Sequence, residues 1–297
     1  MSQPADHDRP RSYPERSGTV VETDEDIRQA LISGLMGQPQ AAAPISPAAA
    51  ARTAVEPAAE PARGASAYRP TIRPPVPILT VFDDGKADGE VIRIREPKFT
   101  IGRSEGHLRF PLDGRMSSRH VEITHQVVGG LNRWVVTDLQ STHGLFVRVT
   151  RTVLADKAEI LVGNGRYRFD GNQPDTGMTA DLVPGPAGHG STQGWADEPG
   201  PFRPPALTEL LGREIGNRIL LVKGEYWIGS DPSCTIHRSD DPFCEPRHVR
   251  LARSSKGGWV AEHNKTQNGL WLRMPQITVD ATIQFQVGEQ RFRLKVQ

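Results

Sequence analysis

The chain has 297 residues, with 36 Lys and Arg against 35 Asp and Glu, which gives a formal net charge of +1. Nucleic-acid and membrane-surface binders usually carry a basic excess, so the charge argues against both classes and names no partner. Two cysteines exclude a disulfide scaffold. No apolar run approaches the roughly 18 residues of a spanning helix, and the polar N-terminus lacks the pattern of an export leader. We therefore expect a cytoplasmic protein without membrane insertion.

Prolines divide the chain, because residues 1–77 hold 12 of the 25 and residues 171–206 hold 7. Both segments lack an apolar period and cannot bury enough apolar surface to offset the entropy of ordering. We expect a disordered N-terminal tail over 1–77 and a flexible linker over 171–206. Two blocks of about 90 residues remain, 78–170 and 207–297.

One short helix is predicted in the tail, at about 24–36. Thr23 is a good N-cap, the acidic residues after it suit the helix dipole, and the apolar residues that follow share one face. The helix is too short to be stable alone. It indicates a docking motif that folds on a partner, with a piece of core as the alternative.

Both blocks consist of short alternating or β-branched segments separated by turn residues, which predicts strands. The first block has them at 78–82, 91–95, 99–102, 121–124, 133–139, 145–149, 159–162 and 166–169. The second has them at 219–222, 226–229, 248–252, 258–262, 270–273, 277–279, 283–287 and 291–296. Eight short strands in each block imply two all-β sandwiches.

Landmarks align the two blocks as an internal duplication. Gly102 matches Gly229, His120 matches His248 and Gly144 matches Gly269, at offsets of 127, 128 and 125 residues. The repeat therefore has the scale of a whole domain.

Loops of the first block concentrate guanidinium groups and hydroxyls. They contain Gly102-Arg103-Ser104, the run from Arg115 through Ser117 and Arg119 to His120, and the run from Asp138 through Thr142 and His143 to Gly144. Arginine forks, hydroxyls and loop amides from separate loops can together hold a dianionic phosphate. Taken alone, each of these residues could instead be a solvated surface charge or a turn former without a binding role.

With these motifs in this order, G-R, S-x-x-H and D-x-x-S-T-x-G, the first block resembles the forkhead-associated (FHA) family of phosphothreonine-binding domains. The resemblance implies that Arg103, Ser117 and Thr142 contact the phosphothreonine, and that Arg115 and Arg119 add basic contacts. It implies structural roles for His120 and Gly144. The family's Asn is His143 here, which cannot present the paired donor and acceptor of an amide.

The second block keeps the strands and loses most of the site. Ser230 replaces the arginine and Glu245 replaces the serine, so a carboxylate would face the phosphate. His248 and Asn268 survive, which leaves weak binding open. We interpret the block as a degenerate FHA-like domain.

A zinc site formed by Cys234, His237, Cys244 and His248 is the weaker interpretation, because His248 already has the family's structural role. We therefore predict no metal and no cofactor. The sequence has no Walker A loop, G-x-S-x-G elbow or H-E-x-x-H motif, so we expect no enzyme.

The sequence thus predicts an adaptor that binds phosphothreonine-containing proteins through its first block, with a Ser/Thr kinase upstream and a possible partner for helix 24–36. The alternative is a scaffold or assembly protein whose two sandwiches bind unphosphorylated partners and whose docking helix tethers it.

Overall fold

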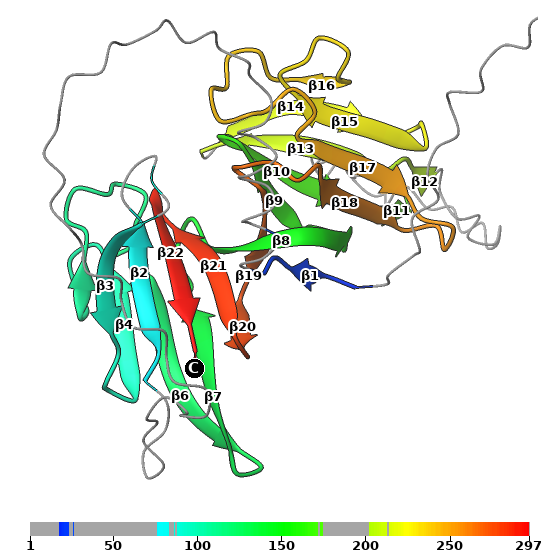
Figure 1. The fold of residues 1–297 in the computed structure, drawn as a ribbon. Coiled ribbons are helices and arrows are strands. Elements are labelled where there is room, and N and C mark those ends of the chain that lie inside the picture. Colours follow the sequence, from blue (N-terminus) through cyan, green and yellow to red (C-terminus); the bar gives the residue numbers. More distant parts are fainter. Residues whose placement is uncertain are drawn as a thin grey trace, which may run out of the picture.

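The computed structural model (Figure 1) contains strands as its regular structure. It describes residues 18–23, 26, 76–82, 86, 88–171, 173–174, 202–212 and 214–296. In these residues the predicted all-β fold with two sandwich cores is confirmed. The predicted helix, except Asp26, and most of the predicted tail and linker lie outside this part. No helix among the described residues is long and apolar enough to cross a membrane.

Every strand predicted from alternation has an observed counterpart in both halves. Strands of the first half are β2 (Ile78–Phe82), β3 (Gly89–Arg93), β4 (Lys98–Gly102), β5 (Leu108–Arg109), β6 (Val121–Val128), β7 (Leu131–Asp138), β8 (Leu145–Leu154), β9 (Glu159–Val162) and β10 (Gly165–Asp170). The sequence missed the short β5, whose two residues are too few to show a period.

The second half repeats this series. Its strands are β13 (Ala206–Leu211), β14 (Glu214–Leu220), β15 (Glu225–Gly229), β16 (Ile236–His237), β17 (Val249–Arg253), β18 (Trp259–His263), β19 (Leu270–Met274), β20 (Gln276–Val279), β21 (Thr282–Val287) and β22 (Gln290–Lys295). The sequence missed β13 and β16. Two-residue strands β11 (Gln173–Pro174) and β12 (Phe202–Arg203) pair at the ends of the predicted linker.

The two hydrophobic cores do not coincide with the predicted blocks 78–170 and 207–297, which is a correction to the domain boundaries. The first core combines residues of β2, β4, β6 and β7 with Phe285, Phe292 and Leu294 from the C-terminal strands. The second combines residues of β15, β17 and β18 with Tyr167 and Phe169 from β10. Each half therefore completes the sandwich of the other with its own C-terminal hairpin (Figure 1).

In this exchange of hairpins, the chain passes from one sandwich to the other through strands β8 and β19. They pair antiparallel, from Leu145 opposite Met274 to Val149 opposite Leu270. Strand β8 has ten residues without Gly or Pro, so nothing turns it back within the first sandwich. Leu145 is buried in the first core and Leu154 in the second. The chain thus crosses between the sandwiches along one continuous strand.

The paired strands join one sheet of each sandwich into a single sheet. Its order is β14-β13-β10-β9-β19-β8, continued through β21, β22, β2 and β3. The outer sheet of the first sandwich has the order β20-β7-β6-β4-β5. The outer sheet of the second has the order β18-β17-β15-β16 and pairs with the C-terminal end of β8. The two halves are therefore arranged alike around the β8–β19 pair.

Two buried aspartates attach the exchanged hairpins. The Asp113 carboxylate accepts a hydrogen bond from the Glu289 amide at 2.8 Å, in the turn between β21 and β22. The Asp241 carboxylate accepts one from the Asn164 amide at 2.8 Å, in the turn between β9 and β10. Each turn therefore bonds to a loop of the opposite half.

Part of the tail is ordered, which corrects the prediction of disorder over 1–77. Strand β1 (Val20–Val21) pairs antiparallel with β8, and Glu22 is buried beyond it. The Thr23 hydroxyl accepts from the Asp26 amide at 3.3 Å, and Asp26 Oδ2 accepts from the Thr23 amide at 3.0 Å. These reciprocal bonds form a capping box, as expected of an N-cap at Thr23.

Candidate functional site

The loop after β4 presents the exposed Arg103 side chain. A Cβ on Gly102 would lie 2.1 Å from the Ser118 carbonyl oxygen, so only glycine allows this approach of two loops. The Arg103 amide donates to the Ser117 carbonyl at 2.9 Å. Backbone contacts therefore fix the position of Arg103 relative to Ser117.

His120 connects the next two loops from a fully buried position. Its Nδ1 accepts from the Ser117 amide at 3.1 Å, so Nε2 carries the proton and donates to the Gly144 carbonyl at 3.1 Å. Burial lowers the pKa of His120 by more than the hydrogen bond to the Gly144 carbonyl raises it, so the net shift is downward. A neutral imidazole thus holds Ser117 beside the loop between β7 and β8.

That third loop is shaped by two residues outside the predicted set, Asp138 and Ser141. Ser141 Oγ donates to Asp138 at 2.5 Å and accepts from the Gly144 amide at 2.9 Å. The exposed Thr142 is attached to the second loop, because its amide donates to Ser117 Oγ at 3.2 Å. The structure therefore brings Arg103, Ser117 and Thr142 together.

Gly144 has a φ of 88° and borders the second half of the chain. A Cβ there would lie 2.3 Å from Nε of Arg273 on β19. Both the backbone conformation and the close arginine therefore require glycine at this turn.

Arg115 extends the basic surface and is positioned partly by the C-terminal hairpin. Its amide donates to Asp113 Oδ1 at 2.9 Å, and its Nε lies 3.4 Å from the Glu289 carboxylate. The sequence gave no signal for Asp113 or Glu289, because the contact depends on the strand exchange. Glu289 of the second half therefore helps to position Arg115 of the first.

Arg119, unlike Arg103 and Arg115, lies beside a carboxylate of a strand. Its Nη2 lies 4.0 Å from a carboxylate oxygen of Glu122 on β6, and its side chain is about half exposed. Arg119 therefore adds positive charge near the loops while its guanidinium is directed toward a strand.

His143 occupies the position that Asn268 occupies in the second half. Burial and the nearby Arg166 guanidinium lower the pKa of His143, whereas a hydrogen bond to the Arg115 carbonyl raises it, and the net shift is downward. In the second half, Asn268 Nδ2 donates to the Phe243 carbonyl at 3.1 Å. Phe243 corresponds to Arg115, so the imidazole makes the same backbone contact as the amide.

The second half preserves this scaffold with other side chains. His248 Nδ1 accepts from the Glu245 amide at 3.1 Å, and its Nε2 donates to the Gly269 carbonyl at 2.9 Å. Glu245 Oε1 accepts from the Gln267 amide at 2.5 Å, as Ser117 Oγ does from Thr142. Ser230 stands where Arg103 stands in the first half and bonds through its amide to the Glu245 carbonyl at 3.0 Å. A carboxylate therefore occupies the place of the serine hydroxyl.

The two cysteines of the weaker zinc interpretation are buried thiols. Cys234 Sγ lies 3.1 Å from the Pro246 carbonyl oxygen, to which it donates. Burial, followed by the charge of Asp241, raises the pKa of Cys244 to about 12. Among the described residues, no group of three or more His, Cys, Asp and Glu is arranged to hold a metal ion.

Comparison with known proteins gives a family for part of the chain. Four solved chains match, whereas no curated protein does. Full-length yeast Pml1p is 19% identical over 25% of this chain and 57% of its own, so the match spans little more than half of it, with a TM-score of 0.23. A structure from an analysis of phosphothreonine-dependent FHA domain interactions is 30% identical over 31% of this chain and 91% of its own, with a TM-score of 0.20. Residues 99–163 match the FHA domain family. The chain therefore contains an FHA domain in its first half.

Proposed function

We propose that the first sandwich binds phosphothreonine peptides at its three loops and that the chain is a non-enzymatic adaptor. The observation that carries this proposal is the joining of three loops around Ser117: its carbonyl accepts from the Arg103 amide, its hydroxyl accepts from the Thr142 amide, and its amide donates to the buried His120. Two donors on separate loops and an exposed guanidinium suit a dianionic phosphate. The FHA match over residues 99–163 supports the same chemistry.

In this proposal each predicted residue keeps its role. Arg103 and Ser117 contact the phosphate, Thr142 borders it, Arg115 and Arg119 add positive charge, and His143 faces the peptide backbone. Their ligand would be made by a Ser/Thr kinase. A partner for helix 24–36 remains a prediction, because the helix lies beyond the described residues.

We further propose that the second half is a degenerate FHA-like copy that does not bind phosphate. The copy is supported by the hydrogen bond from His248 to the Gly269 carbonyl, which repeats the bond from His120 to the Gly144 carbonyl. The loss of phosphate binding is supported by the Glu245 carboxylate, which accepts from the Gln267 amide. A phosphate there would meet a like charge. The rival function, assembly through unphosphorylated partners, would use both halves.

Binding should require both phosphate and Arg103. Matched peptide libraries carrying phosphothreonine, phosphoserine or threonine identify a ligand, and calorimetry then compares the full chain with its Arg103→Ala and Ser117→Ala variants. Each variant loses a charge-assisted hydrogen bond, so affinity should fall by about 1.5–3 kcal/mol, or roughly 10- to 150-fold.

The matched control is Arg133→Ala, which removes an exposed arginine of β7 that pairs with Gln126 in the β6–β7 hairpin, away from the three loops. It should bind as the wild type does, and all variants should keep the thermal unfolding transition. Equal affinity for phosphorylated and unmodified peptides would reject the phosphothreonine proposal and favour the assembly function.

His143→Asn should tighten phosphopeptide binding by about 0.5–1.5 kcal/mol. The amide can keep the contact to the Arg115 carbonyl and adds an acceptor for the ligand backbone. Because the pKa of His143 is lowered, wild-type affinity should change more with pH below 6.5 than the affinity of the variant, which keeps only the dependence from protonation of the ligand phosphate. Calorimetry across pH 5–8 tests both. Weaker binding by the variant would mean that the imidazole itself reads a ligand feature.

A further inference from the structure

The tail segment 19–22 is bound to the crossover strand β8 along its backbone. Val20 pairs with Arg151 and Val21 with Val149, and the Glu22 amide donates to the Arg148 carbonyl at 3.3 Å. The Thr19 and Thr152 hydroxyls lie 2.8 Å apart. So short a ladder is marginal by itself. Side-chain contacts must supply most of the stabilisation.

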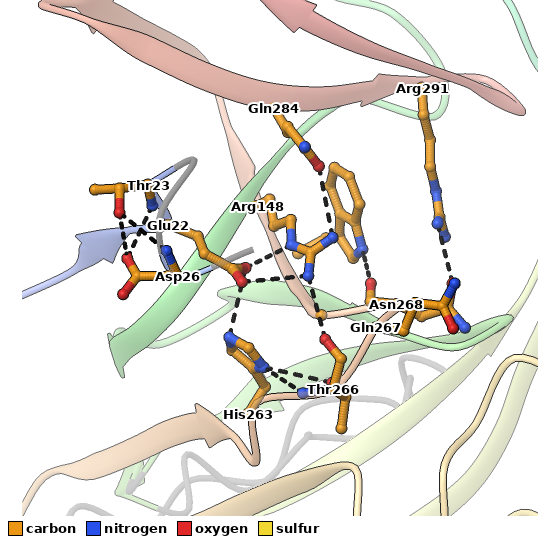
Figure 2. A network of polar contacts seen from close by, with 12 residues as sticks. Glu22, Thr23, Asp26, Arg148, His263, Thr266, Gln267, Asn268, Gln284 and Arg291 are labelled. Carbon is orange, nitrogen blue, oxygen red and sulfur yellow. Dashed lines mark hydrogen bonds and ion pairs between the residues drawn. The ribbon is translucent and has the colours of Figure 1, made fainter. Parts of the chain in front are cut away.

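Glu22 supplies the main side-chain contact. Its side chain is 0% exposed, and its carboxylate accepts from Arg148 Nε at 2.5 Å and from Nη2 at 3.2 Å. His263 Nε2, on the second sandwich, lies 3.4 Å away (Figure 2). Burial raises the pKa of Glu22, but the His263 and Arg148 contacts outweigh it and lower the pKa below its usual value. The segment therefore delivers a buried carboxylate to a cationic site.

The internal duplication shows what this site lacks. Arg273 on β19 corresponds to Arg148 on β8, and its Nη1 lies 2.8 Å from the carboxylate of Glu159, which belongs to the exchanged strand β9. The residue that corresponds to Glu159 is Gln284, whose neutral Oε1 lies 3.5 Å from Arg148 Nη1. Arg148 is thus a buried arginine without a carboxylate on the exchanged strand, and Glu22 provides one.

The corresponding position in the other half is open. A cleft of about 320 Å³ is lined there by Asp138, Glu159, Arg273 and Met274, among others. Asp138 corresponds to His263 and Glu159 to Gln284, so this cleft has two acids, beside Lys157 and Arg273, where the occupied site has a histidine and a glutamine. Two acids therefore already balance the two bases of the cleft, whereas Arg148 has no carboxylate partner until Glu22 binds.

We infer that the strand crossover is a second peptide-binding site, which accepts an extended segment of β-branched residues followed by glutamate, and that residues 19–22 are its resident ligand. Val21 packs against the first core, and Glu22 contacts the second sandwich. The ligand therefore bridges the two sandwiches. Recognition depends on a carboxylate at a fixed register and needs no phosphate.

The test uses a fluorescent peptide of residues 17–26 and the full chain carrying Glu22→Ala, which weakens the resident segment. The peptide should bind this variant at least tenfold more tightly than the wild-type chain, whose own tail competes from a high effective concentration. A Glu22→Gln peptide should bind at least tenfold more weakly than the native one. Arg148→Lys, added to the Glu22→Ala chain, should also weaken binding, whereas the matched Arg273→Lys should not.

A second measurement covers the case in which Glu22→Ala unfolds the chain. Excess unlabelled peptide is titrated into ¹⁵N-labelled wild-type protein, and the amide signals of Val20, Val21 and Glu22 should move to the positions of a free segment. The Glu22→Gln peptide should not cause this change at the same concentration. An unmoved tail in the wild type, or equal binding of native and Glu22→Gln peptides, would overturn the inference.

Discussion

Fragments 76–170 and 202–297 should each fail to fold alone and should fold together when mixed. The first fragment loses the side chains with which the other half fills its core: Val279, Ile283, Phe285, Val287, Phe292 and Leu294. Burial of each large apolar side chain contributes about 1.5–3 kcal/mol. The total loss is comparable with the roughly 5–15 kcal/mol that stabilises a whole domain.

The competing outcome is that β9 and β10 fold back into their own half. That arrangement would put Ile160 in the place of Phe285 and Ala158 in the place of Ile283, and so leave a cavity in the first core. The second core would receive Phe285 for Ile160 and be overpacked. In the first core, Tyr167 would replace Phe292, which stacks on Phe285 at 5.0 Å between ring centroids. The side-chain sizes therefore favour the exchange.

Circular dichroism and thermal unfolding of each fragment and of the equimolar mixture distinguish these outcomes. The mixture should show a cooperative transition, and a tag on one fragment should retain the other. The control mixture uses a 202–297 fragment with Phe285→Ala and Phe292→Ala, which should not restore the fold. A cooperative transition in either fragment alone, at the temperature of the mixture, would show that the hairpins fold back.

The sequence could predict the strands and the loops because both depend on local patterns. Alternation and turn residues locate β2 and β9 to the residue and place Arg103 and Ser117 in loops. The roles predicted for these two residues come from the resemblance to the FHA family. His120 and Gly144 could be located by the spacing of the motifs. The all-β class and the two cores follow from the same signals.

The exchange could not be predicted from these patterns, because the strands of the two halves show the same alternation. Hairpins β9–β10 and β21–β22 are equally apolar on one face, so periodicity does not say which sandwich each completes. The distinguishing information is the size of side chains such as Ile160 and Phe285, which acts only in a packed core. Asp113 and Glu289 were missed for the same reason.

The tail contact was also invisible in the sequence. Glu22 is one acid among several in a polar segment, and two valines do not establish a strand. Only the buried site formed by the Arg148 guanidinium and the His263 ring gives this acid its importance. Such a contact depends on residues more than a hundred positions apart, whereas composition reports only that the region is polar.

Replacing His248 should make the chain less sensitive to acid. Burial lowers the pKa of His248 to about 4, against the hydrogen bond to the Gly269 carbonyl, which raises it. An unfolded histidine has a pKa of about 6.5, so between pH 6.5 and 4 the unfolded state binds a proton that the folded state does not. Stability therefore falls as the pH falls through this window. The loss levels off below about pH 4, where the folded ring also binds the proton.

The contribution of His248 to this loss is about 3 kcal/mol, because the two pKa values differ by roughly 2.5 units. His248→Asn should be less stable than the wild type at pH 7, since the shorter amide cannot bridge the Glu245 amide and the Gly269 carbonyl. The difference should shrink by about 3 kcal/mol toward pH 4, because the variant has no buried imidazole to keep neutral. Urea unfolding at pH 7, 6, 5 and 4 measures the difference, with His237→Asn as the control, because the ring of His237 is exposed. Parallel curves for the wild type and His248→Asn would show that protonation of this ring is not coupled to folding.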